Sequence, residues 1–272
     1  MLPTFTLGPW QIGTYQLMIS LAVGVASIWS LRRLLDLDRP VGIIIRGILL
    51  SAAAGFAGAF AASALATSWR VARSGILARP EGLSVIWGVI SLFLAVALYC
   101  RWQRTSLGRA LDRAAPPMFL GQAIGRLGCT AAGCCYGRPT DSWLGMYLPD
   151  ENGFWAMRYP TQPLSVVADL LICLILLAVE RYIWRRTGER WGWPFDGFLI
   201  LLGIGLFSLK RFGMAFLRQS GTFPMVGALS WMHLNALIGL VLAIALIAWN
   251  LHRQSLIRQM ALQSHQAKRQ AP

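Results

Sequence analysis

Charged residues are scarce in this sequence. Only 13% of the 272 residues are charged and 56% are hydrophobic, whereas a soluble domain averages about 25% charged residues. This composition excludes an ordinary soluble protein and indicates an integral membrane protein. The 25 Lys and Arg against 11 Asp and Glu give a net charge of +14, but the basic residues are spread among short loops. That distribution is typical of a membrane surface, so we expect no nucleic-acid partner.

Histidine is rare, and the common motifs of soluble enzymes are missing. The chain has three histidines and no Walker loop, dinucleotide fingerprint, HExxH or GxSxG motif. These absences weaken ATP-driven, redox, protease and ordinary hydrolase interpretations. No Lys or Arg precedes the first apolar stretch, which therefore lacks the basic region of a signal peptide and is expected to be a retained span.

Apolar runs predict an all-α membrane protein, a seven-span helical bundle in a single integral membrane domain. The polar segment 136–162, rich in Gly, Pro and Trp, is expected to be a small insertion outside the membrane between spans 4 and 5. We expect Pro116 and Pro117 to open the fourth span, and 251–272 to be a basic, frayed tail. The spans are predicted at about 12–31, 43–66, 84–100, 116–135, 163–179, 195–212 and 231–249.

Lysine and arginine are unevenly divided between two sets of loops. The segments 32–40, 101–113 and 181–190, with the tail, hold 15 of the 25 basic residues, and the opposite loops hold eight. By the positive-inside rule the richer set faces the cytoplasm. We therefore expect the N-terminus and the 136–162 insertion to face outward, and the C-terminal tail to be cytoplasmic.

One arginine falls inside a predicted span. Arg126 lies in the segment 121–140, GQAIGRLGCTAAGCCYGRPT, about 15 Å along a helix that begins near Pro116. A charge near the bilayer midplane is costly and marks a functional site. The guanidinium either binds carbonyls of a broken helix or binds an anion. Because Asp169 and Asp196 are the only acidic candidates in the spans, we favour an external anion such as a lipid phosphate.

Other polar residues lie near the predicted outer ends of the last two spans. Arg211 is a candidate to face inward, whereas Lys210 and Arg218 are of the kind that more often snorkels to the interface. His233 opens the seventh span. It either anchors that helix at the interface or accepts a proton near neutral pH.

Three of the five cysteines share the segment of Arg126. Cys129, Cys134 and Cys135 have the spacing C-x4-CC, which matches no common zinc or iron–sulfur pattern. Histidine, the other usual ligand, is almost absent. We therefore predict that these thiols are small packing residues and that the protein uses no metal and no cofactor.

The run GRLGCTAAGCCYGRPT resembles the segment G-R-[IL]-G-[NC]-x3-G-x2-[WY]-G-R of the prolipoprotein diacylglyceryl transferase family, bacterial inner-membrane enzymes that begin lipoprotein maturation. The chain also carries likenesses to three further family motifs, in the same order. These are Gly8-Pro9 with Tyr15-Gln16-Leu17-Met18 for GP…YGLM, Tyr159-Pro160-Thr161-Gln162 for [HR]P[TS]Q, and Arg211 with Phe216-Leu217-Arg218-Gln219 for R-x3-E-[FL]-[FL]-R-Q.

The resemblance implies transfer of the diacylglyceryl group of phosphatidylglycerol to the lipobox cysteine thiol of a prolipoprotein, with release of glycerol 1-phosphate. It implies phosphatidylglycerol, membrane lipid and prolipoprotein signal peptides as partners, in the bacterial inner (plasma) membrane. Arg126 and Arg211 would hold the departing phosphate. Tyr15, His233 or the phosphate itself would take the thiol proton, or a positive field near Arg126 would make a base unnecessary. The implied substrate-binding residues are Gly125, Cys129, Tyr136, Gly137, Arg138 and Arg218.

The chain departs from the family pattern at several proton-handling positions. The histidine of the HGGLIG box is Ile86 here, the acidic residue of the sixth-span block is Ala215, and the tyrosine four residues before its arginine is Phe207. The Y-E pair after P-T-Q is Leu164-Ser165, and Cys129 replaces an asparagine, as in branches with the GCCYG form. Alternatives are therefore a catalytically silent relative that binds or presents a phospholipid, or a transferase with another acceptor.

Overall fold

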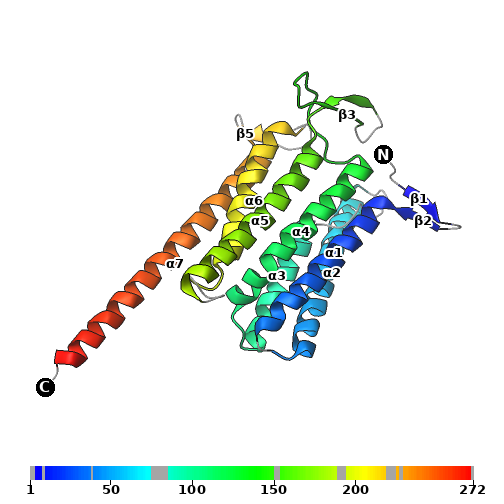
Figure 1. Cartoon of the computed structure of the whole chain (residues 1–272). Coiled ribbons are helices and arrows are strands. Elements are labelled where there is room, and N and C mark those ends of the chain that lie inside the picture. Colours follow the sequence, from blue (N-terminus) through cyan, green and yellow to red (C-terminus); the bar gives the residue numbers. More distant parts are fainter. Residues whose placement is uncertain are drawn as a thin grey trace. The chain divides into compact units, whose positions relative to one another are not determined.

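Helices dominate the structure. The computed structural model describes residues 4–7, 10–37, 39–74, 85–149, 154–188, 194–218, 225–226 and 229–270. These residues form seven α-helices, coloured along the chain in Figure 1. They are α1 (Thr14–Leu34), α2 (Val41–Ser74), α3 (Val85–Trp102), α4 (Leu107–Ala132), α5 (Thr161–Thr187), α6 (Phe198–Leu217) and α7 (Trp231–Gln270).

The expected seven spans are matched in part. Among the described residues, five helices are long and apolar enough to cross a membrane, namely α1, α2, α5, α6 and α7. The apolar part of α3, Trp87–Trp102, is shorter, and α4 carries buried Asp112 and Arg113 in its first turns. A multi-pass membrane protein follows from these five helices, and the count of seven spans stays a prediction.

Short antiparallel hairpins interrupt the helical pattern, so the chain is not purely α-helical. The described strands pair as β1 (Thr4–Leu7) with β2 (Trp10–Gly13), β3 (Met146–Pro149) with β4 (Trp155–Arg158), and β5 (Met225–Val226) with β6 (Leu229–Ser230). The β3–β4 hairpin lies within the predicted 136–162 insertion. The predicted frayed tail instead continues α7 as a helix to Gln270.

The chain divides into two compact units, Met1–Trp29 with Leu111–Pro272, and Ser30–Ala110. In the second unit, α2 and α3 meet through small residues. A Cβ added at Gly88 would lie 3.0 Å from the Cβ of Ala59 and 3.1 Å from the carbonyl oxygen of Gly55. Small side chains every four residues therefore let these two helices approach closely.

The larger unit has a core made by α4, α5 and α6. Its buried members are Ala115, Phe119, Ile172, Cys173, Leu176, Leu199 and Ile200. Two glycines let α1 approach α4. A Cβ at Gly121 would lie 2.9 Å from the Cβ of Ala26, and one at Gly128 would lie 2.9 Å from the Cβ of Met18. The glycine-rich segment thus brings α1 against the end of α4 that carries Arg126.

The fourth helix begins earlier than predicted. It starts at Leu107, and Pro116 and Pro117 lie buried within it. Most of the segment 101–113, which was expected to be a basic loop, is therefore helical. Its Asp112 carboxylate accepts hydrogen bonds from the backbone N–H groups of Gly197 (2.8 Å) and Ile200 (2.9 Å). This carboxylate caps the start of α6, where unpaired N–H groups and the helix dipole favour a negative charge.

The early start of α4 also moves Arg126 relative to the helix ends. Arg126 lies six residues before Ala132, which places it roughly 9 Å from the end of the helix. The position about 15 Å from the helix start was therefore wrong. Because prolines inside membrane helices are tolerated where the surrounding protein re-satisfies the backbone, Pro116 was not a reliable start signal.

Candidate functional site

The segment after α4 turns back sharply on itself. Gly133 and Cys135 both have left-handed backbones, with φ of 70° and 63°, and this conformation is unfavourable for a residue that carries a Cβ. The Thr161 hydroxyl donates to the carbonyl of Cys135 (2.7 Å), and the Gln162 amide donates to the carbonyl of Cys134 (2.9 Å). Both donors are 1% exposed. The start of α5 therefore holds this turn in place.

Gly137 fixes the next part of the same segment. It pairs with Arg218 in an antiparallel bridge, and the Arg138 N–H donates to the carbonyl of Leu217 (2.9 Å). A Cβ at Gly137 would collide with the carbonyl oxygen of Tyr159. Glycine is therefore needed at this position for close backbone packing against Tyr159 and the end of α6, and its predicted part in substrate binding stays a prediction.

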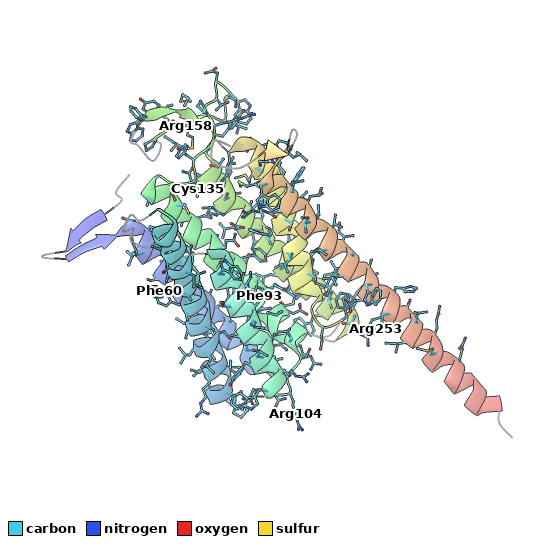
Figure 2. The ribbon with its side chains drawn as sticks, turned by 180° about the vertical axis from the view of Figure 1, so that it is seen from behind. Phe60, Phe93, Arg104, Cys135, Arg158 and Arg253 are labelled. Atoms are coloured by element: carbon cyan, nitrogen blue, oxygen red, sulfur yellow. The ribbon has the colours of Figure 1, made fainter. Side chains whose placement is uncertain are left out.

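Two arginine–tyrosine contacts join the 133–140 segment to β4 and its end. The Arg158 guanidinium lies 4.8 Å from the ring centre of Tyr136, and that of Arg138 lies 5.7 Å from the ring centre of Tyr159. Hydrogen bonding with Thr140, helped by the Arg138 charge, lowers the pKa of the Tyr159 phenol. Figure 2 shows Cys135 and Arg158 at one end of the larger unit, with Arg253 of α7 at the other.

Four cationic side chains and one carboxylate are linked by electrostatic interactions at this end of the helices. Arg126 interacts electrostatically with Lys210, Arg211 and Asp169. Arg211 also interacts with Arg218. Among the described residues no carboxylate forms an ion pair with any of the three arginines. The cluster of Arg126, Lys210, Arg211, Arg218 and Asp169 therefore carries a net charge of +3 and suits an anion.

Lys210 does not lie at the interface as a solvated side chain. Its ammonium lies 2.6 Å from the Asp169 carboxylate, and the two side chains are 8% and 0% exposed. The ammonium also sits 4.4 Å from the ring centre of Phe207. The prediction that Lys210 snorkels was wrong because the lysine faces α5, where Asp169 supplies a buried partner. Because Asp169 is already paired with Lys210, its carboxylate does not form an ion pair with Arg126.

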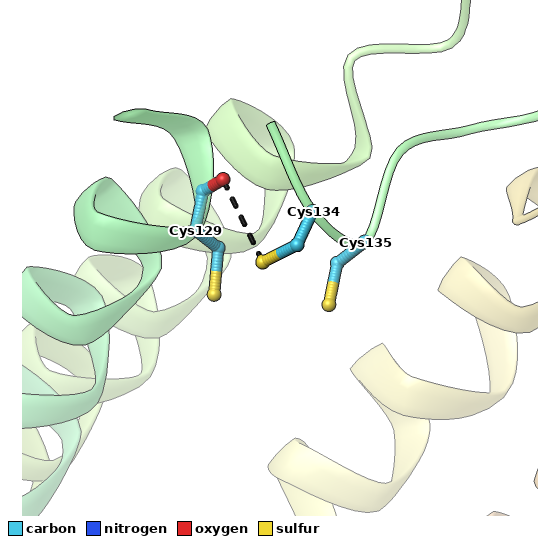
Figure 3. Close-up of side chains that lie close together, drawn as sticks. All are labelled: Cys129, Cys134 and Cys135. Atoms are coloured by element: carbon cyan, nitrogen blue, oxygen red, sulfur yellow. Dashed lines mark hydrogen bonds between the residues drawn. The ribbon is translucent and has the colours of Figure 1, made fainter. Parts of the chain in front are cut away.

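Tyr15 and three thiols lie beside Arg126. The Tyr15 side chain interacts electrostatically with Arg126 and with Cys129, Cys134 and Cys135, and it is 38% exposed. The three sulfur atoms lie within 4.8 Å of one another, and Figure 3 shows them facing the same space. Cys129 is buried, Cys134 half-buried and Cys135 exposed. Sequence spacing did not anticipate this convergence.

Gly125 and His233 have structural contacts. A Cβ at Gly125 would lie 3.4 Å from the Cδ1 of Ile19, so this buried glycine faces α1. The Nδ1 atom of His233 accepts from the N–H of Ser230 (3.2 Å) and lies 2.8 Å from the Ser230 hydroxyl. The bond from the Ser230 N–H to the His233 side chain corresponds to one half of a capping box at the start of α7. The ring is 4% exposed and packs edge-on against Phe216, with ring centres 4.3 Å apart.

Comparison with known proteins identifies the family of this chain. Residues 3–249 match the family model described as prolipoprotein diacylglyceryl transferase. The chain belongs to the prolipoprotein diacylglyceryl transferase family. The match confirms the resemblance seen in the GRLGCTAAGCCYGRPT segment and covers both compact units.

Curated relatives carry the name phosphatidylglycerol–prolipoprotein diacylglyceryl transferase. One from Dehalococcoides mccartyi is 29% identical over 181 residues, which is 66% of this chain and 65% of the relative. One from Clostridium tetani is 32% identical over 129 residues, 46% of this chain and 49% of the relative. One from Clostridium botulinum is 29% identical over 174 residues, 62% and 64% of the two chains. The chain spans about two thirds of the length of the first of these relatives.

Three features of the site were not found from the sequence. The Asp169–Lys210 pair joins residues 41 positions apart on different helices, and no local pattern announces it. Asp112 looked like part of a loop. The P-T-Q motif was noticed only as a likeness, although Thr161 and Gln162 hold the turn that carries the thiols.

Proposed function

We propose that this protein transfers the diacylglyceryl group of phosphatidylglycerol to the cysteine thiol of a prolipoprotein, releasing glycerol 1-phosphate. The single observation that supports the proposal beyond family membership is the group of three arginines. Arg126, Arg211 and Arg218 lie together without a paired carboxylate among the described residues. A phosphate diester that departs as a monoester gains negative charge, and fixed cations stabilise that charge in the transition state.

The arrangement supports distinct roles for the residues around the phosphate. Arg126 and Arg211 would bind the phosphate oxygens, with Arg218 beside them. The Asp169–Lys210 pair, which interacts with Arg126, would keep the lysine from competing for the same anion. Tyr15 would contact the acceptor thiol or the headgroup, since its side chain interacts with Arg126 and the three cysteines and is 38% exposed. The capping contacts of His233 make it the weaker candidate for a base.

The transferase proposal is tested by reconstitution. The full chain is placed in vesicles that contain labelled phosphatidylglycerol and is supplied with a lipobox peptide. We expect labelled peptide and free glycerol 1-phosphate in equal amounts. Arg126→Ala should reduce transfer by about 10²–10³-fold, Arg126→Lys should retain part of it, and Arg253→Ala, which removes an exposed arginine far from the cluster, should leave it unchanged. No transfer beside an active family member would refute the proposal.

A second function is favoured by the missing proton-handling groups. Ala215, at the family's acidic position, is 3% exposed and packed, and Ile86 replaces the box histidine. A silent relative would bind phosphatidylglycerol through the same arginines and present it without transfer. Binding of phosphatidylglycerol that depends on Arg126, combined with no transfer to any thiol peptide, would establish this alternative.

We further propose that the protein lies in the bacterial inner membrane with seven spans, its N-terminus outside and its C-terminus cytoplasmic. The distribution of basic residues between loops supports this orientation. Alkaline phosphatase fused after Gly145 should be active, and the same fusion after Thr187 should be inactive. The reverse result would overturn the orientation without affecting the proposed reaction.

A further inference from the structure

The three thiols at the end of α4 form a cluster that the phosphate site does not use. Their sulfur atoms lie within 4.8 Å of one another. A tetrahedral zinc ion bound to thiolates at about 2.3 Å holds its sulfurs about 3.8 Å apart. Small side-chain rotations would bring the three sulfur atoms to the spacing that zinc requires. Three ligands with a free fourth position are characteristic of catalytic zinc, whereas structural zinc has four protein ligands.

The backbone around the thiols is held in advance of any ligand. Cys135 keeps its left-handed conformation (φ 63°), and the carbonyls of Cys134 and Cys135 accept hydrogen bonds from buried Gln162 and Thr161. The Cys134 N–H donates in turn to the carbonyl of Cys129 (3.2 Å). Strained backbone held by buried partners is typical of ligand clamps. Packing alone explains buried Cys129 but not exposed Cys135.

Charge around the cluster also suits bound zinc. Three thiolates and one Zn²⁺ carry a net charge of −1, and a fourth thiolate makes it −2. Arg126 and Arg218 both interact electrostatically with Cys135, so they offset this negative charge. The same arginines would lie next to the phosphate of the lipid donor. A thiolate on the metal and a phosphate on the arginines would therefore be neighbours.

We propose that Cys129, Cys134 and Cys135 bind one zinc ion, and that the free fourth position of this ion binds the thiol of the acceptor peptide. The second part rests on the proposed function. The thiol loses its proton to water when it coordinates, because zinc-bound thiols are deprotonated. Its sulfur then attacks the glycerol carbon that carries the phosphate ester. The S–C bond forms, the C–O bond breaks, and glycerol 1-phosphate leaves with the bonding electron pair. Such a site would replace the thiol activation lost with the histidine at position 86.

Measurement of the zinc bound per chain tests the site without reference to activity. The full chain, purified under reducing conditions, is loaded with Zn²⁺ and dialysed, and we expect about one zinc ion per chain. Cys134→Ser and Cys135→Ser should each retain less than about a tenth of it. The matched controls Cys100→Ser and Cys173→Ser, which alter buried thiols elsewhere, should retain it all. Failure of the unaltered protein to bind Zn²⁺ or Co²⁺ would overturn the proposal, whether or not the variants fold.

Cobalt substitution tests the fourth position. Co²⁺ bound to the unaltered protein should show sulfur-to-cobalt charge-transfer absorption, and a lipobox peptide should intensify it by one further thiolate. The same peptide with serine in place of cysteine should have no effect. An unchanged spectrum with the cysteine peptide would overturn thiol activation. Transfer that persists after complete removal of zinc would also overturn it, yet leave the proposed reaction intact, whereas absence of transfer by the zinc-loaded protein would refute the proposed reaction.

Discussion

Removing one partner of the Asp169–Lys210 pair should strongly destabilise the larger unit. In Asp169→Asn the Lys210 ammonium, with 8% of its side chain exposed, loses the carboxylate that lies 2.6 Å away. An unpaired buried charge costs about 3–5 kcal/mol when one partner of a buried pair is removed. Since folded proteins are stable by about 5–15 kcal/mol, the variant should lose a large part of its free energy of unfolding.

Unfolding in mixed micelles with increasing SDS measures this loss. The 12 tryptophans provide the fluorescence signal, and Asp141→Asn, which alters an exposed aspartate in the 133–145 loop, is the matched control. The double variant Asp169→Leu with Lys210→Met replaces the pair by apolar side chains. We expect this double variant to be more stable than Asp169→Leu alone or Lys210→Met alone, because neither charge is then left buried without its partner.

Two results would refute this reasoning. A loss below about 0.5 kcal/mol in Asp169→Asn, the range of ordinary surface substitutions, would mean that Lys210 reaches water or another anion. Additive losses in the double variant would mean that the two side chains are not coupled. Either result would also free Lys210 to join the arginines in binding phosphate.

Further predictions address the cap of α6, the turn and the histidine. Asp112→Ala should lower the free energy of unfolding by about 1–3 kcal/mol, because two buried N–H groups lose their acceptor, whereas Asp112→Asn should cost less in the same SDS titration. Gly137→Ala should abolish transfer and lower stability because its Cβ would meet Tyr159, while Gly213→Ala, with nothing within 4 Å, should do neither. His233→Gln should leave the pH–rate profile of transfer unchanged, and loss of one limb of that profile would restore His233 as the base.

Span interiors could be predicted from apolar runs, but helix ends could not. The runs at 43–66 and 231–249 lie inside α2 (Val41–Ser74) and α7 (Trp231–Gln270). Hydropathy detects only the apolar part of a helix, which is about as long as the bilayer is thick. The helix itself can continue into polar sequence, because its backbone hydrogen bonds do not depend on apolar side chains. The fourth helix was the hardest to predict, because an acidic residue and two prolines are typical of a loop. Only the tertiary contact in which Asp112 caps α6 explains why this acidic residue lies in a buried helix.

The arginines of the proposed anion site were predictable, but the side chains around them were not. Arg126 and Arg211 were identified from an unusual charge and a family motif, which are local features of the sequence. Lys210 is adjacent to Arg211 and has a different environment, because neighbours on a helix point about 100° apart. Which of them faces α5 depends on packing. The thiol cluster likewise depends on a left-handed turn at Gly133 and Cys135, which a spacing of C-x4-CC does not specify.

The position of Arg126 near the end of α4 strengthens the case for a lipid phosphate. An arginine at the bilayer midplane would have to draw a charged headgroup deep into hydrocarbon, at a large cost in desolvation. The guanidinium instead lies roughly 9 Å from the end of α4, so a headgroup would have a shorter way to travel from that end of the helix than from the other. The exposed Cys135 and the β3–β4 hairpin lie at the same end of the larger unit. Under the proposed function, a donor lipid and an acceptor thiol would therefore meet at this end of the unit.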